Sequence, residues 1–268
     1  MYRLLLLWFA AGYALAEPIP YAPTAADAVP AAILGKGGPP RGQPLQYFAA
    51  DPKAVGYLAE PANPPPHGAV ILIHEWNGLL ERVKQVADAF AAEGYVALAA
   101  DLYSGRTGAN PQENMALVKE TLANPQQLID NLAAAAAYLK GRADVTGKVA
   151  AIGWCYGGGV ALSFGLGNDN HEGTAMFYGR LLDDPDKLKH MHHELYGTFA
   201  GLDQSIPPAA VDTFVAALRK AGVPNDVHIY DDVNHGFWLY VDRDPEANLQ
   251  PALNAWQRLK AYLQRTLQ

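Results

Sequence analysis

The chain has 268 residues, of which 50% are hydrophobic and 18% are charged, and it holds a single cysteine. This length is ample for one large folded domain, and the low share of charge excludes disorder for the bulk of the chain. The formal net charge is −7, with 20 lysines and arginines against 27 acidic residues. Because no run of basic residues could follow a phosphate backbone, nucleic acid is not an expected partner.

The first sixteen residues predict a signal peptide. Arg3 supplies a positive start, residues 4–15 form an apolar run, and Ala14-Leu15-Ala16 matches a cleavage site of small residues. The run is too short for a stable membrane span, so we expect no membrane insertion after the signal is removed. The sequence therefore predicts an exported protein, periplasmic or secreted, that begins at Glu17. A retained N-terminal helix on a cytoplasmic protein is the alternative.

Residues 17–45 differ in composition from the rest of the chain. Seven of the 20 prolines and a Gly-Lys-Gly-Gly run fall there, with little periodicity. Proline-rich segments of this kind are extended. We therefore expect a proline-rich arm over the surface of a domain that spans residues 46–268.

Strands and helices alternate after residue 46. The apolar runs that predict buried strands lie at 69–73, 95–100, 148–153, 174–178, 195–200 and 226–230. Helical patterns lie at 81–93, 125–140, after Gly157, at 207–221 and at 245–267. This alternation predicts an α/β fold with a mostly parallel central sheet and helices on both faces. The connection from 230 to 245 is long, which suggests a functional role.

The lone cysteine lies in the string Gly153-Trp154-Cys155-Tyr156-Gly157, between a predicted strand and a predicted helix. This is the pattern of a sharp turn that presents a nucleophile between two glycines. The following helix favours a thiolate at its N-terminus, and the next backbone N–H can stabilise an oxyanion. The pattern predicts Cys155 as a nucleophile, with a buried structural cysteine as the alternative.

An acid and then a histidine are expected to follow such a nucleophile in chain order. Asp203 comes just after the strand at 195–200, and His235 lies in the long loop after the strand at 226–230. Both lie at carboxyl ends of strands, where open α/β sheets hold their sites. Asp231 and Asp232 compete with Asp203 but are very close to His235 in sequence. Glu75, after the strand at 69–73, is either a further site carboxylate or a solvated loop acid.

Several strings resemble the dienelactone hydrolase family, which are α/β-hydrolases with a cysteine in place of serine. They are ILIHEWNGL, EGYVALAADLYSG, GKVAAIGWCYGGG, AGLDQSIPP and NHGF, and the resemblance runs from roughly residue 47 to the C-terminus. It implies that Cys155 is the nucleophile, His235 its base and Asp203 the orienting acid. It also implies that Glu75 is the accessory carboxylate, which contacts the resting thiol.

The same resemblance implies an oxyanion hole made by the backbone N–H groups of Tyr156 and Trp76. Family members that take dienelactone bind its carboxylate with arginines. Here Arg106 comes one position late after the Asp-Leu-Tyr string, and Leu239 stands where a cation is expected. We therefore expect a more aromatic and less anion-selective pocket. The expected substrate-binding residues are Arg106, Tyr103, Trp238 and Phe237.

These features predict a hydrolase of a lactone or small carboxylic ester that works through a thioester on Cys155. No cofactor or protein partner is implied beyond the small-molecule substrate. A metal is not expected, because His190, His192 and His193 lack the further ligands that a zinc site needs. The alternatives are a thiol-dependent acyltransferase or amidase on the same scaffold, or a non-catalytic module in which Cys155 senses oxidant.

Overall fold

A computed structural model of the chain describes residues 24, 25 and 27–268. The expected signal peptide at 1–16 and the first part of the proline-rich arm lie outside these residues. Among the described residues, no helix is both long and apolar enough to cross a membrane.

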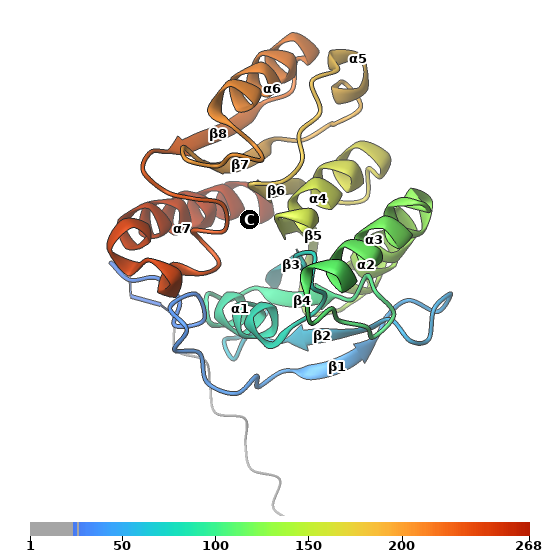
Figure 1. Ribbon diagram of the computed structural model, residues 1–268. Helices are drawn as coiled ribbons and strands as arrows, with labels where there is room; N and C mark the ends of the chain where they lie inside the picture. Colours follow the sequence, from blue (N-terminus) through green and yellow to red (C-terminus); the bar gives the residue numbers. More distant parts are fainter. Residues whose placement is uncertain (1–23, 26) are drawn as a thin grey trace, which may run out of the picture.

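One sheet, with strands in the order β1-β2-β4-β3-β5-β6-β7-β8, runs through the middle of the described residues (Figure 1). The neighbours from β4 to β8 run parallel, whereas β1 and β2 add an antiparallel edge. The predicted α/β fold with a mostly parallel sheet is confirmed. The strand bounds are β1 Gln43–Gln46, β2 Val55–Ala59, β3 His67–Ile73, β4 Val96–Ala100, β5 Val145–Trp154, β6 Gly173–Phe177, β7 Leu195–Ala200 and β8 Asn225–Tyr230.

Helices cover both faces of the sheet, with α1 and α7 on one face and α2, α3, α4 and α6 on the other (Figure 1). The central strands are apolar throughout because both of their faces are covered. In β3, for example, Val70 and Leu72 pack toward α1 and α7, whereas Ile71 and Ile73 pack toward α3 and α4. The helix bounds are α1 Glu81–Ala92, α2 Pro111–Leu122, α3 Pro125–Lys140, α4 Tyr156–Gly167, α5 Pro185–Leu188, α6 Pro208–Ala221 and α7 Pro245–Leu267, with a 3-10 turn at Val241–Arg243.

Sequence periodicity did not predict β1, β2, α2 or α5. The helix α2 buries only Asn114 and Leu117, so its sequence has no apolar stripe to give a helical period. The strands β1 and β2 have four and five residues, and α5 is a single turn of four residues. Such short elements contain too few residues to show a period in the sequence.

The segment before the sheet packs into the domain. Val29, Ala32 and Ile33 are buried in the core on the α1 and α7 face, and the Ile33 carbonyl oxygen accepts a hydrogen bond from the Val241 N–H at 2.9 Å. The expected boundary between residues 45 and 46 falls inside β1. The described end of the proline-rich arm is therefore partly built into the fold.

We predict that Ile33→Ala lowers the free energy of unfolding by about 2–5 kcal/mol, because Ile33 is fully buried and its truncation leaves a cavity. Leu249→Ala on α7 is the control, since Leu249 is 38% exposed, and its effect should stay within about 0.5 kcal/mol. Denaturant unfolding of both variants measures the difference. Equal effects of the two substitutions would show that residues 29–33 add nothing to the core.

Candidate active site

The cysteine lies on a sharp turn between β5 and α4. Cys155 has φ 55° and ψ −116°, a backbone conformation that costs a non-glycine residue free energy and needs support from its surroundings. The support comes from backbone hydrogen bonds. The Cys155 N–H donates to the Phe177 carbonyl oxygen at 3.0 Å, and the Cys155 carbonyl oxygen accepts from the Gly158 N–H at 3.1 Å.

The glycines around Cys155 allow backbone segments to pass closely. A Cβ atom at Gly153 would lie 2.0 Å from the Gly157 carbonyl oxygen, and one at Gly157 would lie 2.3 Å from the Ile73 carbonyl oxygen. Neither position can accept a side chain without moving the backbone. The G-x-C-x-G spacing is therefore the steric condition for this turn, as the sequence analysis expected.

His235 and Asp203 meet across the loops that follow β8 and β7. The distance from His235 Nδ1 to Asp203 Oδ2 is 2.6 Å, and the Asp203 side chain is 1% exposed. The other carboxylate oxygen accepts from the backbone N–H groups of Ser205 at 2.8 Å and Ile206 at 3.1 Å. Burial alone raises the pKa of Asp203, but these hydrogen bonds hold it below its usual value. Asp203 is therefore a carboxylate that orients the imidazole.

The protonation of His235 follows from its neighbours. Burial alone lowers the pKa of His235, yet hydrogen bonds to Asp203 and to Cys155 raise it to about 10. The Tyr178 ring packs beside the imidazole, with 4.8 Å between ring centroids. His235 therefore carries a proton at neutral pH, next to the sulfur. The competing acids Asp231 and Asp232 are exposed, and His235 Nδ1 bonds Asp203 instead.

Glu75 follows β3 and is 6% exposed. Burial raises the pKa of Glu75, whereas a hydrogen bond with Tyr240 and the nearby Arg243 cation lower it. The Arg243 guanidinium lies 3.7 Å from the centroid of the Tyr240 ring. The imidazole of His74 donates from Nδ1 to the Glu75 carbonyl oxygen at 2.6 Å, which anchors the backbone there. Glu75 is thus a buried carboxylate rather than a solvated loop acid, and its contact with Tyr240 was not anticipated.

The two expected oxyanion donors, Tyr156 and Trp76, lie in the segments that follow β5 and β3. Tyr156 is the first residue of α4, and the first N–H groups of a helix have no partner within that helix. Trp76 follows Glu75 in a turn closed by the hydrogen bond from the Gly78 N–H to the Glu75 carbonyl oxygen at 3.2 Å. Both Tyr156 and Trp76 line the same cavity as Cys155 and His235.

That cavity has a volume of about 900 Å³. Cys155 and His235 lie in its wall, and most of its other lining side chains are aliphatic. Representative aliphatic residues from α2, α3, α4 and the loops after β6 and β7 are Met115, Leu122, Ile129, Leu166, Leu181 and Ile206. The sequence did not predict this lining, because it comes from five separate segments that share no motif.

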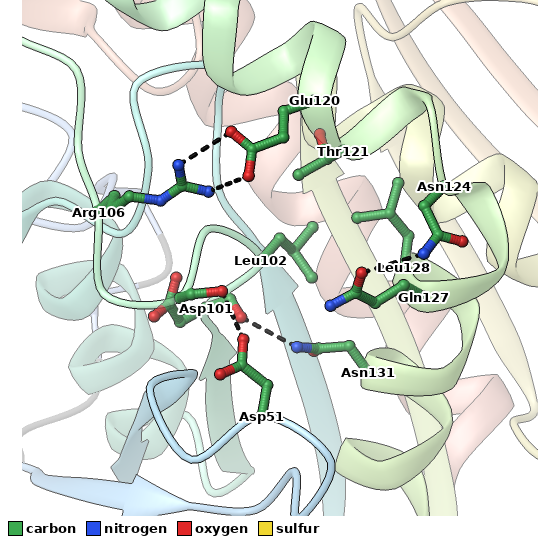
Figure 2. Close-up of a pocket in the computed structure, with 11 residues that line it drawn as sticks. Asp51, Asp101, Leu102, Arg106, Glu120, Thr121, Asn124, Gln127, Leu128 and Asn131 are labelled. Atoms are coloured by element: carbon green, nitrogen blue, oxygen red, sulfur yellow. Dashed lines mark hydrogen bonds and ion pairs between the residues drawn. The ribbon is translucent and has the colours of Figure 1, made fainter.

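Arg106 lies in a different place from the one expected for a substrate-binding residue. It lines a separate small cavity of about 60 Å³ and makes a two-pronged ion pair with Glu120, at 2.6 and 2.9 Å (Figure 2). It is not among the residues that line the large cavity. The structure therefore does not bring Arg106 together with Cys155.

The three expected aromatic substrate-binding residues are core residues. Trp238 and Phe237 are buried because the turn after His235 folds back onto the sheet, where the Trp238 ring stacks on Trp154 at 5.5 Å. Tyr103 is also fully buried, and its hydroxyl donates to the Trp76 carbonyl oxygen at 3.1 Å. Tyr103 thus supports the loop that carries Trp76, whereas the other two rings stabilise the sheet.

The histidines at 190–193 do not converge. His193 Nε2 lies 2.8 Å from the hydroxyl of Thr174, and His192 is an exposed residue 4.0 Å from Asp169. Within residues 24, 25 and 27–268, no group of three or more His, Cys, Asp or Glu side chains is arranged to hold a metal ion.

Comparison with known proteins places this geometry in a family. The model of the dienelactone hydrolase family matches residues 55–267. A protein of Methylorubrum extorquens, provisionally named carboxymethylenebutenolidase, is 29% identical over 266 residues, covering 94% of this chain and 88% of its own. A Synechocystis protein with the same provisional name is 30% identical over 234 residues, covering 80% of this chain and 92% of its own.

Solved structures agree on the fold. A dienelactone hydrolase-like promiscuous phosphotriesterase, P91, from metagenomic libraries superposes with a TM-score of 0.73 at 18% identity, covering 86% of this chain and 100% of its own. The family match, the two relatives and the fold confirm the expected resemblance. The chain belongs to the dienelactone hydrolase family and is a hydrolase with the α/β-hydrolase fold.

Proposed function

We propose that the chain hydrolyses a lactone or small carboxylic ester through a thioester on Cys155. The observation that carries the proposal is one chain of contacts at the wall of the large cavity. Cys155 on its strained turn is hydrogen-bonded to His235, and His235 is oriented by the buried Asp203 at 2.6 Å. A nucleophile, a base and an orienting acid in hydrogen-bond contact are the parts that acyl transfer needs.

In the first half of the reaction, the proton shared by Cys155 and His235 is on the imidazole and the sulfur attacks as a thiolate. A bond forms between the sulfur and the ester carbonyl carbon, and the carbonyl oxygen becomes an oxyanion. The N–H groups of Tyr156 and Trp76 stabilise this charge. The carbon–oxygen bond to the leaving group then breaks, and the leaving oxygen takes the proton of His235.

In the second half, His235 is neutral and accepts a proton from water while the water oxygen attacks the thioester carbon. The carbon–sulfur bond breaks, the carboxylic acid leaves, and the imidazolium stands again beside the thiolate. Asp203 keeps the Nδ1–H directed toward itself throughout, so that Nε2 faces the sulfur. No cofactor takes part in these steps.

Glu75 is proposed as the accessory carboxylate of the site. It is buried close to His235, whose charge lowers the Glu75 pKa, and Tyr240 binds it. The Tyr240 hydrogen bond holds the Glu75 carboxylate near His235 in the substrate-free protein, and substrate displaces the carboxylate when it binds at the thiol. Tyr240 is a positioning residue in this scheme.

We also propose that the mature protein is exported, on the strength of the residue pattern at 1–16. Expression of the full chain in a bacterium, followed by N-terminal sequencing of the product in the periplasm and medium, is the test. A product that begins at Glu17 supports export. Export is contradicted if the protein is found only in the cytoplasm and still contains Arg3.

We predict that Cys155→Ala lowers the hydrolysis of p-nitrophenyl acetate by about 10³-fold or more, because the thioester can no longer form. The far-UV circular dichroism spectrum of the variant should match that of the wild type, which shows that the fold is unaffected. An alanine variant that hydrolyses the ester at the wild-type rate would contradict the role of Cys155. If added amines or alcohols capture most of the acyl group in place of water, the protein is an acyltransferase instead.

The pair of His235 and Asp203 predicts a pH-dependent stability. His235 has a pKa of about 10 in the folded protein against an ordinary value of 6.5, so its stabilising contribution is complete below pH 6.5 and is lost as the pH rises toward 10. Asp203→Asn weakens the interaction that raises the pKa. The difference in thermal midpoint between wild type and Asp203→Asn should therefore be largest at pH 5 to 6 and shrink steadily up to pH 10.

Asp231→Asn serves as the control in the same pH series, because Asp231 is an exposed acid on the same loop that does not bond the His235 ring. Its difference from the wild type should stay small and flat with pH. A flat difference for Asp203→Asn as well would contradict the proposed ion pair.

A further inference from the structure

Two hydrogen bonds fix the imidazole of His74, which is fully buried directly after β3. The Leu102 N–H donates to Nε2 of this ring at 3.2 Å, so Nε2 carries no proton. The Nδ1–H donates to the Glu75 carbonyl oxygen at 2.6 Å. Burial also lowers the pKa of His74, which keeps the ring neutral at neutral pH. The single ring proton therefore points at the peptide group that joins Glu75 to Trp76.

This peptide group carries the N–H that the proposed function uses as an oxyanion donor. It is a trans peptide, and a trans peptide is planar, with its C=O and N–H pointing in opposite directions. A contact that fixes the Glu75 carbonyl oxygen therefore also sets the direction of the Trp76 N–H. Among the described residues, no group accepts a hydrogen bond from that N–H. Trp76 lines the large cavity together with Cys155, so its N–H is free to bind an oxyanion there.

The backbone around Trp76 has two further contacts. The hydroxyl of Tyr103, in the loop after β4, donates to the Trp76 carbonyl oxygen at 3.1 Å. The Gly78 N–H donates to the Glu75 carbonyl oxygen at 3.2 Å, which is longer than the contact from His74. Because these contacts remain when the His74 bond is removed, we expect the peptide group to tilt and not to be released.

We propose that His74 is a positioning residue of the reaction. Its Nδ1–H orients the peptide group between Glu75 and Trp76, so that the Trp76 N–H faces the oxyanion that forms when a carbonyl carbon bonds to Cys155. The inference rests on the proposed function and adds a fully buried residue that does not line the cavity. Both halves of the reaction pass through an oxyanion, so His74 acts on formation and on hydrolysis of the thioester. Loss of a whole oxyanion donor costs about 10²–10³-fold in kcat, and a tilted donor costs less.

Two substitutions test the proposal, because each keeps one of the two hydrogen bonds of the ring. In His74→Asn the side-chain nitrogen is as many bonds from Cα as Nδ1, so the donor to Glu75 is kept and the acceptor for Leu102 is lost. In His74→Gln the amide oxygen is as many bonds from Cα as Nε2, so the acceptor is kept and the donor is lost. Each variant loses one buried hydrogen bond, so their free energies of unfolding should fall by similar amounts.

We expect His74→Gln to lower kcat for p-nitrophenyl acetate by about tenfold with little change in KM, because a tilted N–H stabilises the oxyanion less and leaves ground-state binding unchanged. His74→Asn should stay within about threefold of the wild-type kcat. A purely structural role predicts that activity follows stability in both variants. Equal losses of kcat in His74→Gln and His74→Asn would therefore overturn the proposal.

Alkylation of the thiol separates an effect on the oxyanion from an effect on the thiolate. Iodoacetamide forms a carbon–sulfur bond with Cys155 and releases iodide, and no oxyanion forms in this step. Because the chain contains one cysteine, the rate reports on that thiolate alone. Both His74 variants should react within about twofold of the wild-type rate. An alkylation rate that falls in parallel with kcat would assign the effect of His74 to the thiolate and overturn the proposal.

His171→Gln is the matched control. His171 is also buried, and its Nε2 lies 3.2 Å from the Thr174 hydroxyl. It precedes β6, at the opposite end of the parallel sheet from the strand ends that carry the site. This substitution removes a buried imidazole without touching the segment around Trp76, so kcat should stay within about twofold of the wild type. A tenfold fall in this control would show that kcat responds to loss of any buried histidine and would overturn the role of His74.

A trifluoromethyl ketone separates this inference from the proposed reaction. The sulfur of Cys155 bonds to the carbonyl carbon of 1,1,1-trifluorobutan-2-one, and the carbonyl oxygen becomes an oxyanion with no leaving group to expel. The dissociation constant of this adduct, measured by fluorine NMR, should rise about tenfold in His74→Gln and stay near the wild-type value in His74→Asn. If no ester is hydrolysed but this difference is present, the proposed function fails and the role of His74 stands. If hydrolysis depends on Cys155 but all three proteins bind the ketone equally, the role of His74 fails and the function stands.

Discussion

The close approach of two backbone segments at Cys155 is the constraint on which the site depends. The turn brings the carbonyl group of Gly157 to a point where a Cβ on Gly153 would lie 2.0 Å from its oxygen. This approach requires glycine at position 153, and Cys155 in the same turn has a φ of 55°, a conformation that its surroundings must support. The strain is tolerated because a covered parallel sheet holds β5 rigidly between β3 and β6. The thiol consequently stands at the start of α4, clear of the sheet.

Charge at the site is controlled by burial combined with specific partners. Asp203 and Glu75 are both nearly buried, but their environments move their pKa values in opposite directions. Asp203 receives hydrogen bonds from His235 and from two backbone N–H groups, whereas desolvation outweighs the polar contacts of Glu75. Asp203 therefore stays charged and orients the His235 imidazole. At Glu75, burial makes the charged form less favourable.

The aromatic residues around the site act mainly as its support. Trp238 stacks on Trp154 and lies 5.0 Å from Phe177, which ties the loop that carries His235 to the strands that carry Cys155 and Tyr178. The large cavity is lined instead by aliphatic side chains from α2, α3 and α4. This division explains why a pocket that was expected to be aromatic is lined chiefly by leucine, isoleucine, valine and methionine.

Local residue patterns determined the α/β fold, the turn at Cys155 and the chain order of Cys155, Asp203 and His235. Buried strands and their helices have strong periodicity, and a residue flanked by glycines between a strand and a helix has few other structural explanations. Only the tertiary structure decided that His235 bonds Asp203 rather than one of the two acids that precede it in the loop. It also decided that Arg106 pairs with Glu120 and that residues 29–33 enter the core. Only the tertiary structure brought the Leu102 N–H to the His74 ring. These features depend on distances between segments far apart in the chain, and such distances arise when the sheet brings its strand ends together.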